Sequence, residues 1–516
     1  MAGPATLLCA RGPAARSAPA MGAHGGHAMR RTIVVVLALN ALSAATAAAP
    51  APAAPPPQAA PRNVIIILSD DHRYDFMGFM PGAPEWLETP GMDRMAAAGG
   101  HVANAFVTTS LCSPSRASIL TGQYAHRHGV VDNTSPIPPG TVFFPEHLRR
   151  AGYRTALVGK WHMGEEAGSD RPRSEFDHWV SFRGQGVYQD PVLNINGEQR
   201  RLQGYTTDVL TDQALAWLDR VRGEGRPFFL LLSHKAVHAE FVPAPRHAGR
   251  FADAPIRYPE TMVNTDAMYR GKPSWVREQR YSWHGVDHMY HGAMDFDTFY
   301  RAYAETLLAL DESVGRVLDY VDANGLAAST LVLYMSDNGF MLGEHGLIDK
   351  RQAYEESIRI PMLAYAPGFV PAGAKLTGMV RNIDIAPTVL ELAGVPKPDA
   401  MDGRSVLSVL RGEASASEEE LLYEYYWEYA FPHTPTVFAL RDGRYKYIYY
   451  HGVWDTNELY DLETDPAERF NLIDLPAYRE QVARLRDRMW DRLEQTGGML
   501  IPLKRAGVWQ AAERKR

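Results

Sequence analysis

The sequence predicts an α/β fold in which a large, mostly parallel central sheet is covered by helices on both faces. Strand-like and helix-like segments alternate from Asn63 onward, and this alternation is typical of parallel sheets with helices on either side. The strand-like segments are continuous apolar runs, as expected for strands buried on both faces. After about residue 412, aromatic alternation predicts a smaller C-terminal subdomain with an antiparallel sheet.

Four segments carry the strongest strand signal, and each runs into polar residues at its carboxyl end. They cover residues 63–71, 154–160, 227–234 and 330–337. Ligands of parallel sheets bind beyond the carboxyl ends of the strands. The polar residues that follow these segments are therefore the first candidates for a functional site.

Helices are predicted where apolar residues recur at three- and four-residue steps. The predicted helices cover residues 206–221, about 299–324, 383–394 and about 476–496. In the C-terminal part, Asp442-Gly443 lies between two apolar runs. This dipeptide predicts a β-hairpin, as expected in an antiparallel sheet.

The start of the chain differs in composition from the rest. Arg30-Arg31 precede the apolar stretch TIVVVLALNALSAATAAA, and a Pro/Ala-rich stretch follows it. This order is typical of an export signal. A membrane-spanning helix needs about 20 apolar residues, and this stretch is shorter and interrupted, so no stable membrane span is expected. We expect export machinery to deliver the protein to the periplasm or to the outside of a bacterial cell.

The expected organisation follows from these shifts in composition. An export signal over 1–49, with Met29 as an alternative true start, precedes a Pro/Ala linker over 50–61. A catalytic domain is expected over 62–412 and a C-terminal subdomain over 413–516.

Net charge and cysteine content limit the functions that fit the sequence. The formal net charge is −7 and no long run of Lys or Arg occurs, so nucleic-acid binding is not expected. Cleavage of the leader would remove Cys9 and leave Cys112 as the single cysteine. Exported proteins usually use cysteines in pairs. Because Cys112 would have no internal partner, a different role is indicated.

Acidic and amide residues follow two of the predicted strands. They are Asp70, Asp71, Asp337 and Asn338. Oxygen ligands of this kind suit a hard divalent cation such as Ca²⁺ or Mg²⁺. Either pair alone is more typical of a turn, but two pairs at the ends of two buried strands favour a cation site.

A second set of candidates carries a positive charge or an imidazole ring. The set comprises Arg116, Lys160, His162, His238 and Lys350. If Pro114 opens a helix, the side chains of Cys112 and Arg116 lie close to one face of it. The N–H groups at that helix terminus would favour an anion beside residue 112. Taken singly, each of these residues is more often an ordinary surface or packed residue.

The segment CSPSR at 112–116 resembles the Cys-x-Pro-Ser-Arg motif of the type I sulfatases, and ASILTG continues the longer pattern. The segments NVIIILSDDHR, GKWHMG, SDNGFMLGEHG and YDLETDP also resemble the family's blocks, in the family's order. The resemblance covers the chain from about Asn63 to about Leu472. It implies an alkaline-phosphatase-like sandwich fold and the activity of a sulfuric ester hydrolase.

The resemblance implies a modified nucleophile and one bound calcium ion. In the family, a formylglycine-generating maturation enzyme oxidises the motif cysteine, here Cys112, to 3-oxoalanine, also called formylglycine. One hydroxyl of the hydrated aldehyde attacks sulfur, and the second hydroxyl later allows sulfate to leave. The implied metal ligands are Asp70, Asp71, the modified Cys112, Asp337 and Asn338.

The resemblance also assigns roles to the positively charged residues. Arg116 and Lys160 match residues that hold the modified side chain. His162 matches the base that removes a proton from the second hydroxyl, and Lys350 matches a lysine that contacts the sulfate. Positive groups around a sulfate ester offset its charge and stabilise the transition state, which gives these assignments a physical reason.

The leaving-group acid is the position at which the sequence departs from the family. The family usually has a Pro-His pair after the strand of the FFLLLS type, whereas Val237 replaces the proline here. We expect His238 to protonate the leaving alcohol, with His234 as the alternative at that position. Lys350 is a further possible source of the proton.

The C-terminal sequence most resembles that of bacterial sulfatases related to the N-acetylglucosamine-6-sulfatases. This likeness implies a sulfated saccharide substrate, a glycosaminoglycan or a mucin-type sugar. Candidate sugar contacts are His234, His345, Trp427, His433 and Trp454. For the two tryptophans, a place in the core of the subdomain is an equally good interpretation.

Two functions of other classes stay open on the sequence alone. The first is a phosphonate or phosphate ester hydrolase, because relatives with this fold, some with the same modified cysteine, act at phosphorus. The second is a non-catalytic sugar-binding relative, which would bind glycans without turnover.

Overall fold

The computed structural model of the protein describes residues 62–164, 169–289, 295–413 and 420–502. The expected export signal over 1–49 and the linker over 50–61 lie outside the described residues. None of the described helices combines the length and the apolar character that crossing a membrane requires. The expected domain boundary at residue 412 stays a prediction.

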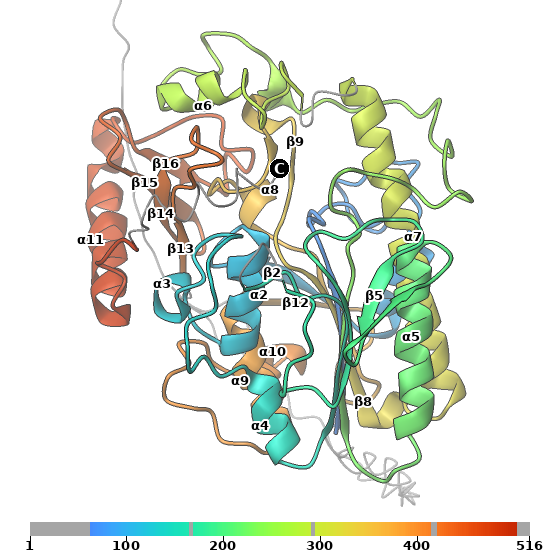
Figure 1. Cartoon of the computed structure of the whole chain (residues 1–516). Helices are drawn as coiled ribbons and strands as arrows, with labels where there is room; N and C mark the ends of the chain where they lie inside the picture. The colour runs from blue at the N-terminus through green and yellow to red at the C-terminus, as the bar shows by residue number, and fades with distance from the viewer. Residues whose placement is uncertain (1–61, 165–168, 290–294, 414–419, 503–516) are drawn as a thin grey trace, which may run out of the picture. The chain divides into compact units, whose positions relative to one another are not determined.

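A ten-stranded sheet lies at the centre of the described chain (Figure 1). Its strands in chain order are β1 (Asn63–Ser69), β2 (Gly100–Phe106), β3 (Arg154–Lys160), β4 (His178–Phe182), β5 (Val192–Ile195), β6 (Glu198–Arg201), β7 (Phe228–Ser233), β8 (Thr330–Ser336), β11 (Met362–Tyr365) and β12 (Ala374–Arg381). Their order in the sheet is β12-β2-β11-β8-β1-β7-β3-β4-β5-β6. The run from β8 through β1, β7 and β3 to β4 is parallel, whereas β11 and β5 are antiparallel to their neighbours.

The four predicted strands are β1, β3, β7 and β8, and they are neighbours in this sheet. β1 pairs with β8 on one side and with β7 on the other, and β7 pairs with β3. The register places Leu68 beside Ser233 and Ser69 beside Ser336. The predicted mostly parallel sheet is confirmed, and the polar residues that follow these strands lie along one edge of it.

Helices cover both faces of the sheet, with α5 and α7 on one face and α2, α4 and α9 on the other (Figure 1). The helices are α1 (Pro90–Ala98), α2 (Cys112–Thr121), α3 (Ala125–His128), α4 (Phe144–Arg150), α5 (Thr206–Val221), α6 (Ser274–Gln279), α7 (Phe296–Ala323), α8 (Glu355–Ile358), α9 (Ile385–Leu392), α10 (Leu407–Leu410) and α11 (Arg479–Thr496). The predicted helices correspond to α5, α7, α9 and α11. The last two are shorter than predicted because each is preceded by a 3₁₀ turn.

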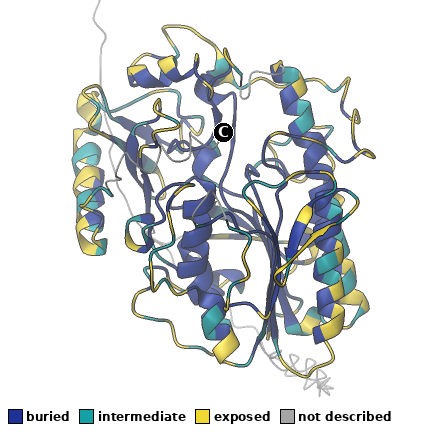
Figure 2. Cartoon of the chain, in the orientation of Figure 1, coloured by how far each residue is buried: buried dark blue, intermediate teal, exposed yellow. Residues whose placement is uncertain are grey.

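Alternate side chains of β1 pack into two separate cores. Ile65 and Ile67 pack with α5 and α7, whereas Val64 and Ile66 pack with α2, α4 and α9. Figure 2 shows the sheet as buried throughout its centre. Burial of each such side chain contributes about 1.5–3 kcal/mol, which explains why β1 is a continuous apolar run.

A second sheet lies in the C-terminal part of the chain and is antiparallel, as predicted. Its strands are β13 (Leu421–Tyr425), β14 (Thr436–Arg441), β15 (Tyr445–His451) and β16 (Glu458–Asp461). The predicted hairpin at Asp442-Gly443 joins β14 to β15, and the Asp442 carboxylate accepts hydrogen bonds from the N–H groups of Arg444 and Tyr445. α11 covers one face of this sheet. A separate two-stranded sheet pairs β9 (Met341–Leu342) with β10 (Ile348–Asp349).

Candidate functional site

The candidate site lies where the carboxyl ends of β1, β3, β7 and β8 meet the N-terminus of α2. Asp70 and Asp71 follow β1, and Asp337 and Asn338 follow β8. The Asp337 N–H donates to Ser69 O at 3.1 Å, so the two ends are joined by the backbone. The sheet register therefore explains how residues more than 260 positions apart meet.

Three buried carboxylates converge at this edge of the sheet. Oxygen atoms of Asp70, Asp71 and Asp337 lie within 4.8 Å of one another. The Asp71 N–H donates to Asp337 Oδ1 at 3.2 Å, and Asn338 Nδ2 donates to Asp71 Oδ1 at 2.7 Å. The four residues that were predicted to hold a cation are thus brought together.

The charges around the carboxylates shift their pKa values in opposite directions. Burial raises the pKa of the Asp71 carboxyl to about 7, opposed by the Lys350 ammonium and reinforced by the other carboxylates. Burial and the Asp70 charge raise the pKa of Asp337. Burial also acts to raise the pKa of Asp70, but Lys160 and other nearby cations hold it well below its usual value. Repulsion between the acids makes an added cation favourable.

The donor set of this cluster fits a hard divalent cation. Asp71 Oδ2 and Asn338 Oδ1 are buried and have no hydrogen-bond partner among the described residues. The other oxygens of the cluster come from Asp70 and Asp337. Carboxylate and amide oxygens without nitrogen or sulfur donors are the ligands that calcium and magnesium prefer.

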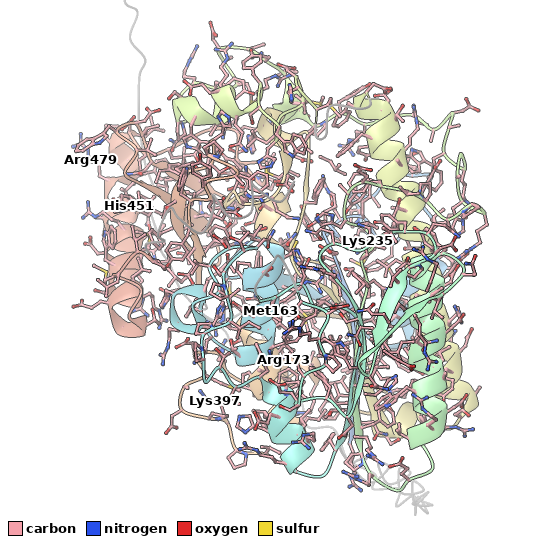
Figure 3. All side chains as sticks on the ribbon, viewed as in Figure 1. Met163, Arg173, Lys235, Lys397, His451 and Arg479 are labelled. Carbon is pink, nitrogen blue, oxygen red and sulfur yellow. The ribbon has the colours of Figure 1, made fainter. Side chains whose placement is uncertain are left out.

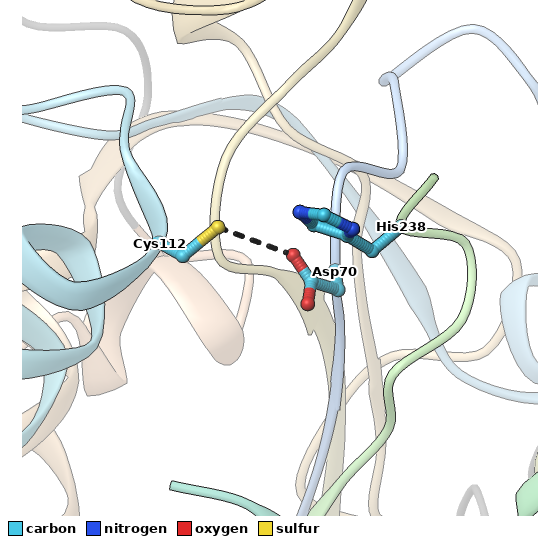
Figure 4. Close-up of side chains that lie close together, drawn as sticks. All are labelled: Asp70, Cys112 and His238. Carbon is cyan, nitrogen blue, oxygen red and sulfur yellow. Dashed lines mark hydrogen bonds between the residues drawn. The ribbon is translucent and has the colours of Figure 1, made fainter. Parts of the chain in front are cut away.

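Cys112 is the first residue of α2 and faces the acidic cluster. Its Sγ donates to Asp70 Oδ1 at 3.5 Å (Figure 4). Burial raises the pKa of the thiol, and the Asp70 carboxylate adds to the rise. A buried, protonated thiol is a poor nucleophile, so the unmodified residue does not fit nucleophilic chemistry. An oxygen-bearing side chain at this position would fit the oxygen-rich cation site beside it.

The helix begins two residues earlier than predicted. Leu111 is the N-cap in an extended conformation, and Cys112 rather than Pro114 opens α2. Pro114 lies in the first turn, where backbone N–H groups have no partner inside the helix, so the missing N–H of proline is tolerated there.

Arg116 joins the ends of three strands from inside the site. Its Nε donates to Asp337 Oδ2 at 2.9 Å, and its Nη1 donates to Lys160 O at 3.0 Å and to Ser233 Oγ at 2.6 Å. Its Nη2 also lies 3.6 Å from Asp70 Oδ2. The guanidinium therefore fixes the first turn of α2 against β3, β7 and β8.

Lys160 and His162 approach the cluster from the end of β3. Lys160 Nζ donates to Asp70 Oδ2 and, at 2.5 Å, to Gln185 Oε1. Ser113 Oγ donates to His162 O and lies 3.3 Å from His162 Nδ1. Burial and the Lys160 charge hold the pKa of His162 well below its usual value, so the ring is neutral.

Lys350 and His238 contact Asp71 of the cluster. Lys350 Nζ donates to Asp71 Oδ1, and His238 Nε2 lies 3.9 Å from Asp71 Oδ2. Ligand atoms of Asp70, Cys112 and His238 also lie within 4.8 Å of one another (Figure 4). All six residues predicted to be catalytic are therefore near the three carboxylates.

His234, the alternative acid, does not reach the cluster. It follows β7 directly, and its Nε2 lies 3.0 Å from Ser313 Oγ on α7. Burial lowers the pKa of His234 to about 3. The His234 ring contacts α7 rather than the carboxylates, so the geometry favours His238 for the acid position.

The other candidate sugar contacts lie in different surroundings. Trp427 and His433 line a pocket of about 390 Å³, together with Trp275 of α6 and His451 of β15. Trp454 is completely exposed, at 102%. His345 is buried, with its ring centroid 4.1 Å from that of Tyr354. The structure thus gathers two of these residues at one pocket and does not bring His345 or Trp454 there.

Sequence reasoning missed two residues at the edge of the site. Gln185, which accepts a hydrogen bond from Lys160, lies in a loop after the unpredicted strand β4. Lys235 lies between the two histidines that were weighed as acids and is 5% exposed. No local spacing marks either residue, although the buried lysine stands in a segment that had been singled out.

Comparisons with known proteins find extensive similarity. The sulfatase family model matches residues 62–395. A second model, described as the C-terminal part of N-sulphoglucosamine sulphohydrolase, matches residues 343–495.

Relatives and a solved structure share much of the chain. An N-acetylglucosamine-6-O-sulfatase of Bacteroides thetaiotaomicron is 31% identical, over 82% of this chain and 84% of the relative. The N-acetylglucosamine-6-sulfatase of Homo sapiens is 31% identical, over 74% of this chain and 70% of the relative. A solved structure in complex with its substrate D-glucosamine-2-N,6-O-disulfate is 30% identical and has a TM-score of 0.78, covering 86% of this chain and all of that one.

Proposed function

This chain belongs to the sulfatase family, and we propose that it hydrolyses sulfate esters of a glycosaminoglycan or mucin-type sugar. The observation that carries the proposal is the position of Cys112. The cysteine of the CSPSR segment opens α2 beside Asp70, within electrostatic reach of Asp337 and of the cations Arg116, Lys160 and Lys350. N-acetylglucosamine-6-sulfatases among the relatives support a sugar as the substrate.

The same residues are proposed to hold one calcium ion. Asp70, Asp71, Asp337, Asn338 and the modified Cys112 would be its ligands, and the two unpartnered oxygens of the cluster support this. The ion, when bound, offsets the charge of the sulfate and draws electron density from its oxygens. A formylglycine side chain at position 112, made by a maturation enzyme, supplies a hydroxyl nucleophile in place of the inert thiol.

The basic residues are proposed to orient and neutralise the sulfate. Arg116 cannot turn freely because its N–H groups are held by β3, β7 and β8, so its charge stays fixed beside position 112. Lys160 and Lys350 are buried and pair with Asp70 and Asp71, respectively. Fixed positive charge in a buried site stabilises the negative charge that develops in the transition state.

Two histidines are proposed to move protons at opposite ends of the reaction. His238 Nδ1–H donates to Ala239 O, so Nε2 is the ring nitrogen that is left to exchange a proton. Burial holds the pKa of His238 well below its usual value, opposed by the Asp70 charge, so Nε2 has to take up a proton before it can give one to the leaving sugar oxygen. His162 Nδ1 lies against Ser113, so Nε2 is the atom available to accept a proton. Because His162 is kept neutral by burial and by Lys160, it is suited to act as the base.

Further parts of the proposal concern the sugar and the cell compartment. Trp427 and His433 line a pocket that is suited to a ring-shaped, partly polar ligand, and we assign sugar contacts to them. Residues 1–49 are proposed to direct export to the periplasm or beyond.

The test is sulfate release from a panel of defined sulfated saccharides. The protein is purified after checking by peptide mass that Cys112 is modified, and the Cys112→Ala protein is the control. Release of sulfate from at least one saccharide, absent in the control, is expected. A faster release of phosphate than of sulfate from matched nitrophenyl esters would contradict the proposal.

A further inference from the structure

Lys235 is a buried cation that the proposed chemistry does not use. It lies two residues beyond the end of β7, at the edge of the sheet where the site is built. The residue is 5% exposed, and in the view of Figure 3 it lies between α2 and α7. His238, the proposed acid, is three residues further along the same segment.

Lys235 differs from the other buried lysines in having no carboxylate partner. Five lysines of the described chain are buried. Four of them form ion pairs with aspartate or glutamate: Lys160, Lys272, Lys350 and Lys446. The described residues offer Lys235 neither an ion pair nor a hydrogen bond at Nζ, which lies 4.6 Å from the centroid of the Tyr188 ring. The ring faces the charge but leaves its N–H groups without acceptors.

An unpaired buried ammonium is unfavourable because the group loses its hydration. Burial lowers the pKa of Lys235 to about 8, and the nearby Lys160 charge adds to this effect. The acids Asp70 and Asp71 oppose it, so Lys235 is within electrostatic reach of the carboxylate cluster. At neutral pH the side chain still carries its charge, which a bound anion would neutralise.

Lys235 contacts residues next to His238, on the side of the site where the sugar is expected. The His238 N–H donates to Lys235 O at 2.9 Å. Tyr188, whose ring lies under the Lys235 ammonium, donates its hydroxyl to His238 O at 2.6 Å. Since His238 is proposed to protonate the oxygen that leaves with the sugar, these contacts place Lys235 next to the residue that would face the sugar.

We propose that Lys235 binds a second anionic group of the sugar, a sulfate or a carboxylate, near the ester that is cleaved. This inference rests on the proposed function, because it concerns recognition of the same substrate. An ammonium group forms charge-assisted hydrogen bonds with either anion. The bound anion would supply the negative charge that no described carboxylate places against Lys235. Lys235 therefore selects sugars with two anionic groups over sugars with one.

The test compares sugars that differ in one anionic group. N-acetylglucosamine 6-sulfate has a single anion, glucosamine 2-N,6-O-disulfate adds a sulfate, and a disaccharide of uronate and 6-sulfated sugar adds a carboxylate. kcat and KM are measured for the wild type, for Lys235→Met, which keeps an apolar side chain against Tyr188, and for Lys235→Arg, which keeps the charge.

Lys235→Met is expected to raise KM for one of the two dianionic sugars about tenfold more than KM for the monoanionic sugar, without a matching change in kcat. The dianionic sugar that responds identifies the bound group as sulfate or carboxylate. Lys235→Arg should retain most of the discrimination. Lys375→Met, on an exposed position of β12, is the matched control and should leave all constants unchanged.

An equal change for all three sugars, or no change for any, would overturn the proposal. If the wild type releases sulfate from none of them, the proposed function fails, and binding then decides the role of Lys235 separately. Calorimetry of the same sugars with Cys112→Ala, with and without Lys235→Met, should show a preference for a dianionic sugar that depends on Lys235. Equal affinities, or no detectable binding, would count against it.

Discussion

The Sγ atom of Cys112 lies 3.5 Å from Oδ1 of Asp70, so the start of α2 and the end of β1 meet at one point. Neither residue is accessible to solvent. The contact brings the proposed nucleophile position to the carboxylate that Lys160 and Arg116 also approach. The first three predictions test what this arrangement does.

Cys112→Ala should abolish sulfate release while leaving the fold intact. The substitution removes one buried heavy atom, which costs about 1 kcal/mol of unfolding free energy. It also removes the sulfur atom, and alanine cannot be converted to the formylglycine nucleophile. We expect turnover to fall by about 10⁴-fold or more. Circular dichroism and thermal unfolding check the fold, and a variant with the wild-type rate would contradict the assignment.

Removal of calcium should lower activity reversibly. Chelation followed by dialysis should reduce turnover, and added Ca²⁺ should restore it. Asp71→Asn should weaken calcium binding at least about tenfold, because one charged ligand becomes neutral. Bound calcium is measured by elemental analysis.

Asp311→Asn is the matched control for the metal site. Asp311 is also a buried carboxylate, but it accepts hydrogen bonds from Gly91 and Met92 at the start of α1. Its replacement should leave calcium content unchanged. Equal loss of calcium in the two variants would argue against a specific site.

Arg116→Lys should impair both stability and catalysis although the charge is kept. A lysine cannot reproduce the fork of N–H groups that binds Asp337, Ser233 and the Lys160 carbonyl. Unsatisfied buried acceptors cost about 1–3 kcal/mol of unfolding free energy, and loss of a fixed charge lowers kcat about 10²-fold or more. Arg94→Lys, in an ion pair at a more exposed position, should change neither quantity.

His128 should make the protein sensitive to acid. Val130 N–H donates to His128 Nδ1 at 3.1 Å, and Nε2 lies 3.0 Å from Ser118 Oγ. Nδ1 must therefore be unprotonated, and burial lowers the pKa of His128 to about 3. The unfolded chain binds a proton at about 6.5, so this contribution to stability is present above that pH and is lost as pH falls towards 3.

The loss at His128 amounts to about 2 kcal/mol between about pH 7.5 and about pH 5. His128→Asn keeps an acceptor for the Val130 N–H but has no titrating group. The difference in unfolding free energy between the wild type and this variant should therefore be about 2 kcal/mol smaller at about pH 5 than at about pH 7.5. Urea unfolding at the two pH values measures it. A difference that does not depend on pH would refute the assignment of the neutral ring.

Trp427 and Trp454 should respond differently to truncation. Trp427 is 48% exposed and lines the pocket that His433 also lines. Its replacement by alanine should raise KM for a saccharide substrate about fivefold or more. Trp454→Ala is the comparison, because its ring is completely exposed. Destabilisation by Trp427→Ala with unchanged KM would instead support a place in the subdomain core.

The parts of the fold that could be predicted are those in which burial is complete. β1, β3, β7 and β8 are continuous apolar runs because both faces of the sheet are covered. β2 was missed because Asn104 interrupts its apolar residues, and the reason for that residue is non-local: its side chain donates to Thr377 O on β12 at 2.8 Å. β11 has only four residues, too few for a periodic signal.

The residues of the candidate site also fall into a group that could be predicted from the sequence and a group that could not. The closeness of the Cys112 and Arg116 side chains could be predicted, because residues four apart lie on one face of a helix. Gln185 could not, because it reaches Lys160 only through the packing of a loop after β4. The sequence could not separate His234 from His238, since both histidines follow β7. In the structure His234 contacts Ser313 of α7, whereas His238 lies beside Asp71.

The complete burial of Cys112 sets a time limit on the proposed maturation. The residue is 0% exposed and forms the first turn of a helix that is buried along its whole length. An enzyme that oxidises Cys112 has to bind the residues around it, and these residues are buried in the folded protein. The proposed oxidation therefore belongs to the interval between synthesis and folding, because the thiol of a folded molecule is out of reach. The fraction of active enzyme in a preparation would then depend on the rate of Cys112 oxidation relative to the rate of folding.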